Sequence, residues 1–417
     1  MKQSVRRAVY LGGALIGGLA AMPASTQQAS APPIARYTMD AGTVSGMAAM
    51  GAGGGSPLAM LRGGAGGAIH ELQLRLGSSR TATGAPAADH FMPAGVGLGP
   101  SVPLITPVSQ SGPSVPVERP QQGQLPSGKL YLFWGCGEHA PAGQPVVIDF
   151  AKMAKGQMPP GLYAAAAGAA DDWRVSQANS KTFGDWPNSR NAKQVPSSAS
   201  LRGDHRIAGN YSPEIAFKLD RDFMPALHPK SSTLASNAFG LTWNGLPEAT
   251  GYYAWAMGAK SAGRNQATEM VWWTSSATQQ FGGSLQDWLS PATVAKLVAA
   301  RTVMAPSQTS CAIPAEVRKL GGDNMMLNLY AYGPQSDFAF PPRPANAKLA
   351  WKPEWTARVR FRANAMTILG MPDMGGFDAS DEDSDGAGAG RPSQQSGKPR
   401  CPGGLKGVAM RAAGACS

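Results

Sequence analysis

The segment with the most reactive side chains is Gly135-Cys136-Gly137-Glu138-His139, which follows an apolar run. A thiol and an imidazole are the nucleophile and base of cysteine hydrolases. Along an extended strand, however, side chains three residues apart point to opposite faces, and the sequence offers no third group that would orient His139. Cysteines of exported chains are more often paired in disulfides. The pattern therefore predicts no catalytic residue.

Metal-binding side chains are present at poor spacing. A zinc site built on Cys136 and His139 would need two more ligands, and the other histidines are scattered at 70, 90, 205 and 228. The acidic cluster near the C-terminus has calcium-loop spacing over its first half, but Pro392 stands at the twelfth position, where the loop needs Glu. We interpret this cluster as a solvated tail, so no metal and no other cofactor is predicted. The weak calcium candidates are Asp381, Asp383 and Asp385.

The chain has four cysteines, and its N-terminal signal-like segment, described below, predicts export to a compartment where disulfides form. Four cysteines allow three connectivities. Two of them lie in strand-like contexts and two share one Gly-rich tail, so we favour pairing within each set. The predicted disulfides are Cys136–Cys311 and Cys401–Cys416.

A row of arginines is the first candidate binding surface. The run Thr356–Ala363 carries an arginine at every second position, with Val359 and Phe361 between them. Period two places the guanidinium groups on one face of a strand at about 7 Å spacing, twice the rise per residue. One hypothesis is an edge strand that uses charge to avoid pairing with other chains. The other is contact with an anionic envelope polymer, because guanidinium forks suit carboxylate and phosphate. The residues concerned are Arg358, Arg360 and Arg362.

Trp272 and Trp273 are the second candidate surface. They are adjacent in a predicted strand, so one ring faces away from the core. That ring is either an exposed sugar-stacking contact or lies under a loop. The serine-hydrolase elbow Gly-x-Ser-x-Gly and phosphate-binding glycine loops are absent from the sequence.

The elements that must position these residues are mostly strands. Phe239–Ser275 is the richest aromatic stretch, and its apolar residues alternate around a turn at Asn244-Gly245. It predicts three strands of a sandwich with Trp243 buried between the sheets. Ser290-Pro291 begins a short helix over 291–301, with Ser290 as its cap. We predict a mostly β fold of two sandwich-like domains with long loops and disordered ends.

Part of the aromatic stretch resembles a fibronectin type III or immunoglobulin-like sandwich over residues 239–335. The residues that carry the resemblance are Leu241-Thr242-Trp243, the turn Pro247-Glu248-Ala249-Thr250-Gly251, Tyr252 and the run Leu329–Gly333. The resemblance implies that the Trp and the Tyr pack between two sheets, and that the domain is a binding or spacer module. The predicted helix is an insertion that this family lacks.

Composition divides the chain into five parts. Lys2, Arg6 and Arg7 precede an apolar Gly/Ala-rich run, as in a secretory signal peptide. The Gly/Ala/Met-rich segment that follows cannot bury enough apolar surface to offset its ordering entropy. The expected parts are a signal peptide (1–31), a disordered linker (32–67), a β-rich domain (68–230), the fibronectin type III-like domain with its inserted helix (231–372) and a disordered tail (373–417).

The signal predicts a periplasmic or secreted protein, and no run is long enough to span a membrane after its removal. The formal net charge of +11 favours an anionic partner such as an envelope polysaccharide, or another envelope protein, over nucleic acid outside the cytoplasm. We expect a non-catalytic binding or structural protein of the envelope. The alternative is a polysaccharide-active hydrolase or lyase, which would show two carboxylates about 5–10 Å apart beside exposed aromatic rings.

Overall fold

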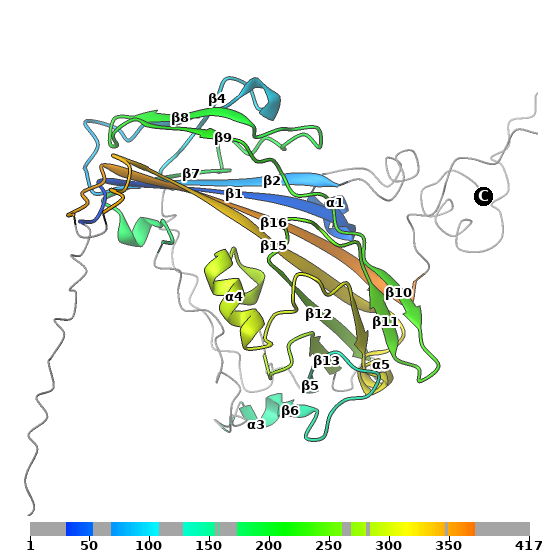
Figure 1. The fold of residues 1–417 in the computed structure, drawn as a ribbon. Helices are drawn as coiled ribbons and strands as arrows, with labels where there is room; N and C mark the ends of the chain where they lie inside the picture. Colours follow the sequence, from blue (N-terminus) through cyan, green and yellow to red (C-terminus); the bar gives the residue numbers. More distant parts are fainter. Residues whose placement is uncertain are drawn as a thin grey trace, which may run out of the picture. The chain divides into compact units, whose positions relative to one another are not determined.

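The computed structural model describes residues 31–52, 68–107, 128–153, 155, 157, 173–260, 268–280, 284–346 and 349–371 (Figure 1). The regular structure of these residues is mostly β, as predicted, with short helices. The strands are β1 (Ala35–Gly46), β2 (Ile69–Ser78), β3 (Ala88–Phe91), β4 (Ser101–Pro103), β5 (Gly128–Trp134), β6 (Val146–Asp149), β7 (Thr182–Trp186), β8 (Gly203–Gly209), β9 (Ile215–Leu219), β10 (Lys230–Thr233), β11 (Phe239–Thr242), β12 (Gly251–Lys260), β13 (Thr268–Thr274), β14 (Ser310–Ile313), β15 (Met325–Phe340) and β16 (Trp355–Leu369). The helices are α1 (Met47–Ala52), α3 (Phe150–Met153), α4 (Pro291–Ala299) and α5 (Ala315–Gly321), with 3-10 turns η1 (Ala94–Val96), η2 (Gln177–Asn179) and η3 (Ser284–Gln286).

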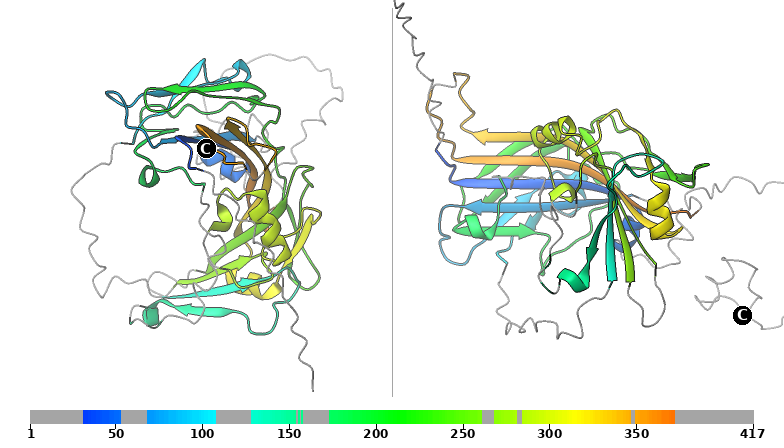
Figure 2. Two further views of the ribbon diagram at one scale, coloured as in Figure 1. Left: turned by 60° about the vertical axis from the view of Figure 1, so that its left-hand side comes forward. Right: turned by 90° about the horizontal axis from the view of Figure 1, so that it is seen from below.

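A nine-stranded sheet is the central layer, in the order β6-β5-β13-β12-β15-β16-β1-β2-β7. β1 pairs parallel with β16 and antiparallel with β2, and β13 pairs parallel with β5. Figure 2 shows the long strands β1, β2, β15 and β16 side by side. Residues from both ends of the described chain therefore meet in the middle of one sheet.

The prediction that residues 32–67 form a disordered linker is wrong for β1. Tyr37, Met39 and Ala41 alternate along this strand, and all three are fully buried in the core. Their small neighbours bury little surface by themselves, but two flanking strands supply the burial and the backbone hydrogen bonds that composition alone does not reveal. Residues 53–67 lie outside the described part of the chain.

The predicted boundary between residues 230 and 231 does not divide the sheet. Strands from 68–230 (β2, β5, β6 and β7) and strands from 231–372 (β12, β13, β15 and β16) are neighbours in it. The local patterns of each strand were informative, whereas strand order depends on long-range pairing, which period-two alternation does not encode.

Two smaller sheets pack on one face of the central sheet. A four-stranded sheet, β4-β3-β8-β9, packs against β1 and β2, and a three-stranded sheet, β10-β11-β14, packs against β12 and β13. Each half is thus sandwich-like, and one continuous sheet serves both. Trp243 is 6% exposed in this core, with its ring centroid 5.5 Å from that of Tyr252. The prediction that Trp243 is buried between sheets is confirmed.

The opposite face of the central sheet is covered by α4 and by residues 284–290, which we call the strap (Figure 1). The predicted helix near 291–301 is confirmed as α4, with Pro291 in its first turn and the Ser290 hydroxyl accepting a hydrogen bond from the Thr293 amide at 3.2 Å. Val294 of α4 and Leu285 of the strap pack on Tyr253 and Tyr330. This face carries Arg360, Arg362 and Trp272.

Candidate binding groove

The arginine row lies on the strap-covered face of β16. Val359 and Phe361 point into the core on the other face, as the alternation predicted. β16, however, lies between β15 and β1 in the middle of the sheet, so the edge-strand hypothesis is wrong. The pairing of β16 with a parallel strand from the opposite end of the described chain is what removes the edge.

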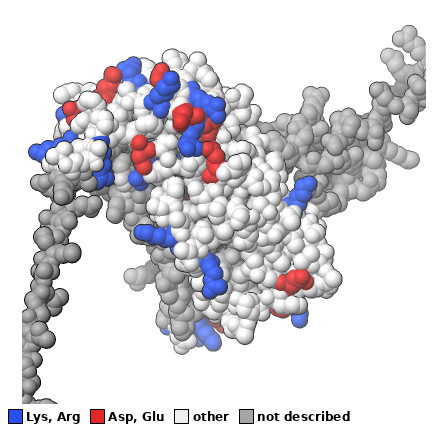
Figure 3. Space-filling view, in the orientation of Figure 1, with Lys and Arg blue, Asp and Glu red and all other residues white. Residues whose placement is uncertain are grey.

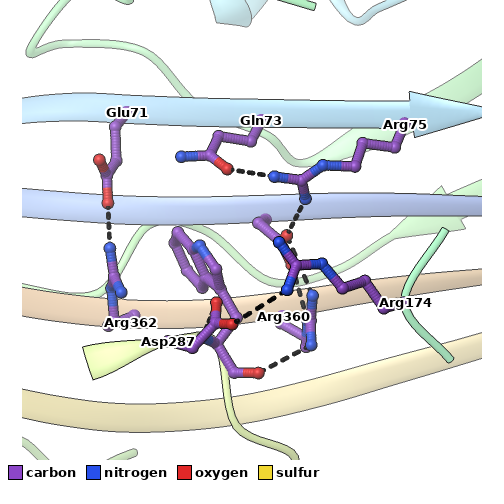
Figure 4. Close-up of polar contacts among 9 residues, drawn as sticks. Glu71, Gln73, Arg75, Arg174, Asp287, Arg360 and Arg362 are labelled. Carbon is purple, nitrogen blue, oxygen red and sulfur yellow. Dashed lines mark hydrogen bonds and ion pairs between the residues drawn. The ribbon is translucent and has the colours of Figure 1, made fainter. Parts of the chain in front are cut away.

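Arg360, labelled in Figure 4, is held inside the molecule by Asp40. Its Nε and Nη2 donate to the two carboxylate oxygens at 2.7 and 3.0 Å, and Arg75 on β2 donates to the same carboxylate at 2.8 Å. Asp40 is fully buried and Arg360 is 6% exposed. Arg360 also donates to the Trp288 carbonyl of the strap at 2.8 Å. This guanidinium is therefore structural.

Arg362 is occupied in the same way. It donates to Glu71 on β2 at 2.8 Å and to the Gln286 carbonyl of the strap at 2.7 Å, with its guanidinium 4.1 Å above the Trp288 ring. The Glu71 side chain crosses β1 over Gly42, where any Cβ would stand 2.4 Å from the carboxylate oxygen. The expectation of an open row of three positive charges is wrong, because the chain supplies its own carboxylates and carbonyls to two of them.

Arg358, at the other end of the row, borders a groove that the strap does not cover. It donates to Asp337 on β15 at 2.9 Å, and its guanidinium lies 4.1 Å from the centroid of the Trp173 ring. Trp351 lines the same groove as Trp173, and the Arg343 guanidinium lies 5.5 Å from the Trp351 ring centroid. Both tryptophans are half-buried. One end of the predicted row therefore adjoins a site with two partly open indole rings.

The groove has two lobes that share Trp173, Trp351 and Thr356. The β15 lobe has a volume of about 450 Å³ and the β1 lobe about 340 Å³. The other residues of the β15 lobe are Asp337, Phe338, Ala339, Pro342 and Arg343. The other residues of the β1 lobe are Ala31, Pro32, Pro33, Arg36 and Pro353. We call the whole site the Trp groove.

Arginines outnumber carboxylates among the described residues of the Trp groove. Arg36 and Arg343 line it and Arg358 borders it, while Asp337 is the one carboxylate that lines it among the described residues. Thr356, 5% exposed, forms the floor common to both lobes, and its hydroxyl has no hydrogen-bond partner in the described part of the chain. A buried hydroxyl without a partner is unusual.

The predicted tryptophan pair is divided between the two faces of β13. Trp273 is fully buried in the core and donates its indole N–H to the Gly135 carbonyl at 2.9 Å. Trp272 lies on the other face, stacked on Trp255 with 4.6 Å between ring centroids. Trp272 packs against two apolar clusters of that face, one that includes Trp255 and one that includes Leu130. The two rings lie on opposite faces of the strand, as the alternation predicted. The outward ring, Trp272, lies against other side chains, and neither tryptophan is among the described residues that line the Trp groove.

The reactive-looking segment is structural. Cys136 and Cys311 form a disulfide, as predicted, and His139 lies 3.2 Å from Glu316 on the surface. No three His, Cys, Asp or Glu side chains of the described residues lie close enough together to hold a metal ion. Cys401, Cys416 and the calcium candidates Asp381, Asp383 and Asp385 lie outside the described residues, as do the tail 373–417 and residues 1–30 of the predicted signal peptide.

Charge elsewhere on the visible surface is mixed. Acidic and basic side chains interleave in the upper part of Figure 3, where Figure 1 shows the four-stranded sheet. One exposed ion pair beside that sheet joins Arg206 and Glu214 at 3.2 Å. None of the helices described is long and apolar enough to cross a membrane.

No known protein family matches the chain, and neither a curated protein nor a solved structure shows significant similarity to it. The geometry of the Trp groove therefore carries the functional argument, and the fibronectin type III resemblance stays a prediction.

Sequence reasoning missed the residues that build the groove. Trp173 and Trp351 lie in segments without periodicity, and Arg36 lies in the strand that composition assigned to a linker. The only local signal was a pair of tryptophans in Pro-rich or loop-like surroundings, where burial in a core is not expected.

Proposed function

We propose that this chain is an exported, non-catalytic binding protein of the bacterial periplasm or cell envelope, and that the Trp groove binds an anionic envelope polysaccharide. The observation that carries the proposal is the convergence of two half-buried tryptophan rings and three arginines on one groove with a single described carboxylate. Indole rings offer flat apolar surfaces for the C–H faces of sugars. Guanidinium groups supply planar donors for carboxylate or phosphate.

Export is supported by two independent features. The basic residues followed by an apolar Gly/Ala-rich run have the form of a signal peptide. The Cys136–Cys311 disulfide suits an oxidising compartment. An envelope polymer is the anionic partner that such a compartment supplies in quantity.

The proposal is tested by retention of the mature protein on an acidic-polysaccharide matrix over a salt gradient. We expect Arg343→Gln and Trp351→Ala to elute at lower salt than the parent, because one removes charge and the other stacking surface. Arg190→Gln is the matched control, since it removes one exposed positive charge outside the groove. Equal elution of all four proteins, with unchanged melting, would contradict the proposal.

The same acidic polysaccharide, free in solution, distinguishes binding from catalysis. A loss of polymer viscosity on incubation with the parent would favour the hydrolase or lyase hypothesis over a non-catalytic role. Asp337, the described carboxylate of the groove, is engaged by Arg358 and by Gln335, whose Nε2 donates to Asp337 at 2.7 Å. This engagement supports a binding site, because a general acid or base needs a carboxyl that is free to exchange a proton with the ligand.

A further inference from the structure

The floor of the Trp groove spans three adjacent strands. Ala339 on β15 is the pairing partner of Thr356 on β16, and Thr356 is the partner of Arg36 on β1. Neighbouring strands lie about 4.8 Å apart, so the floor extends about 10 Å across the sheet from Ala339 to Arg36. A floor of this width has room for two consecutive pyranose rings.

The two lobes repeat the same chemistry on either side of Thr356. The β15 lobe contains Arg343, and the β1 lobe contains Arg36. Trp173 and Trp351 border both lobes. Each lobe thus offers one guanidinium and aromatic walls, which is the arrangement that a repeating acidic polymer requires.

We propose that the Trp groove binds two consecutive residues of an acidic polysaccharide that crosses β15, β16 and β1, with one oxyanion facing Arg343 and the next facing Arg36. This inference rests on the proposed function and adds the ligand class, its direction and its minimum length. The shared chemistry is an oxyanion, carboxylate or phosphate, on a saccharide ring.

An acidic glycan suits this groove better than a Pro-rich peptide, the other ligand that aromatic grooves take. Among the described residues of the groove, Arg36 and Arg343 offer guanidinium donors to a ligand, while Asp337 is paired with Arg358. A Pro-rich peptide brings no oxyanion for these donors. The walls contributed by Pro32, Pro33, Pro342 and Pro353 are rigid, which reduces the entropy lost when an extended chain binds.

Calorimetric titration of the mature protein with galacturonate oligomers of one, two and four residues tests the two-lobe arrangement. We expect the two-residue oligomer to bind about tenfold or more tightly than one residue, because the second contact becomes intramolecular. The four-residue oligomer should gain little more. Arg36→Gln and Arg343→Gln should each reduce the two-residue affinity toward that of one residue, whereas the control Arg190→Gln should not change it.

Each outcome bears on a different part of the inference. Failure of every oligomer and of the polymer to bind would overturn the proposed function together with this inference. Retention of the polymer with equal affinities for one and two residues would overturn the two-lobe arrangement alone. A phosphorylated disaccharide that binds more tightly, with the same dependence on both arginines, would support the arrangement and assign the oxyanion as phosphate. A Pro-rich peptide that displaces the two-residue oligomer at equal concentration would overturn the saccharide assignment.

Discussion

At the residue scale, a directed chain of hydrogen bonds joins the central sheet to the four-stranded sheet. The Tyr37 hydroxyl lies 2.7 Å from His90 Nδ1, His90 Nε2 lies 3.0 Å from His205 Nδ1, and His205 Nε2 lies 2.7 Å from the Leu201 carbonyl. Because a carbonyl only accepts, His205 must donate through Nε2, and each earlier member of the chain then donates to the next. Both histidines are buried and neutral in this arrangement.

This chain predicts that the protein loses stability in mild acid. Burial lowers the pKa of His90 well below its usual value, with a further effect of neighbouring His205, and burial also lowers the pKa of His205 despite the opposing Leu201 carbonyl and Asp204. Below pH about 6.5 the unfolded chain takes up protons that the folded chain resists, so stability is full above that pH and falls beneath it. The slope is about 1.4 kcal/mol per pH unit for each such histidine, measured by urea unfolding between pH 7.5 and 5.

His205→Gln should reduce that slope while keeping the fold. The Gln amide contains both an acceptor for His90 and a donor for the Leu201 carbonyl, but it has no proton to gain. His228→Gln is the matched control, because His228 is exposed. A slope equal to that of the parent in the His205→Gln variant would show that the buried pair does not govern the acid sensitivity.

At the element scale, β1, β2 and β16 are bound together by side chains that cross the sheet surface. Asp40 of β1 receives a guanidinium from each neighbouring strand, and Glu71 of β2 passes over Gly42 to Arg362 of β16. The two ion pairs differ in burial, since Asp40 has no exposed side-chain surface and Glu71 is 30% exposed. Removing the partner of a buried charge destabilises the folded protein far more than removing the partner of an exposed charge.

We therefore predict that Asp40→Asn destabilises the protein by about 3–5 kcal/mol, and that Glu71→Gln costs about 1 kcal/mol or less. The first change leaves two guanidinium groups short of a charge, one of them buried, whereas solvent can reach the second site. Urea unfolding of the two variants measures both values. Similar costs at the two sites would mean that the Asp40 cluster is no more desolvated than the Glu71 pair.

At the scale of the whole molecule, the Cys136–Cys311 disulfide joins the segment after β5 in the central sheet to β14 in the three-stranded sheet, across 175 residues of sequence. A link that closes so long a loop removes much of the freedom of the unfolded chain. The Cys136→Ala/Cys311→Ala double variant should lose about 2–5 kcal/mol of unfolding free energy. The parent in the presence of reductant should show the same loss. An unchanged urea midpoint in both cases would show that the packed sheets hold together without the link.

The sequence by itself determined the local elements. Period-two alternation identified Trp243 and the buried face of β16, the Ser290-Pro291 pair located the start of α4, and the strand-like contexts of Cys136 and Cys311 indicated their pairing. Strand faces and helix starts depend on neighbouring residues, and disulfide formation depends on the compartment that the signal peptide predicts. The sequence alone therefore contains the information needed to predict them.

Tertiary structure alone decided which of these residues meet. β1 is Gly/Ala-rich and reads as a linker until β2 and β16 flank it, because burial and backbone pairing come from strands distant in sequence. The same pairing placed Arg360 beside Asp40 and turned a predicted binding row into a structural cluster. It also brought Arg36, Thr356 and Trp173 to one groove from three separate parts of the chain. Side-chain types set what a residue can bind, but distance sets what it does bind, and those distances depend on long-range strand order that local patterns do not encode.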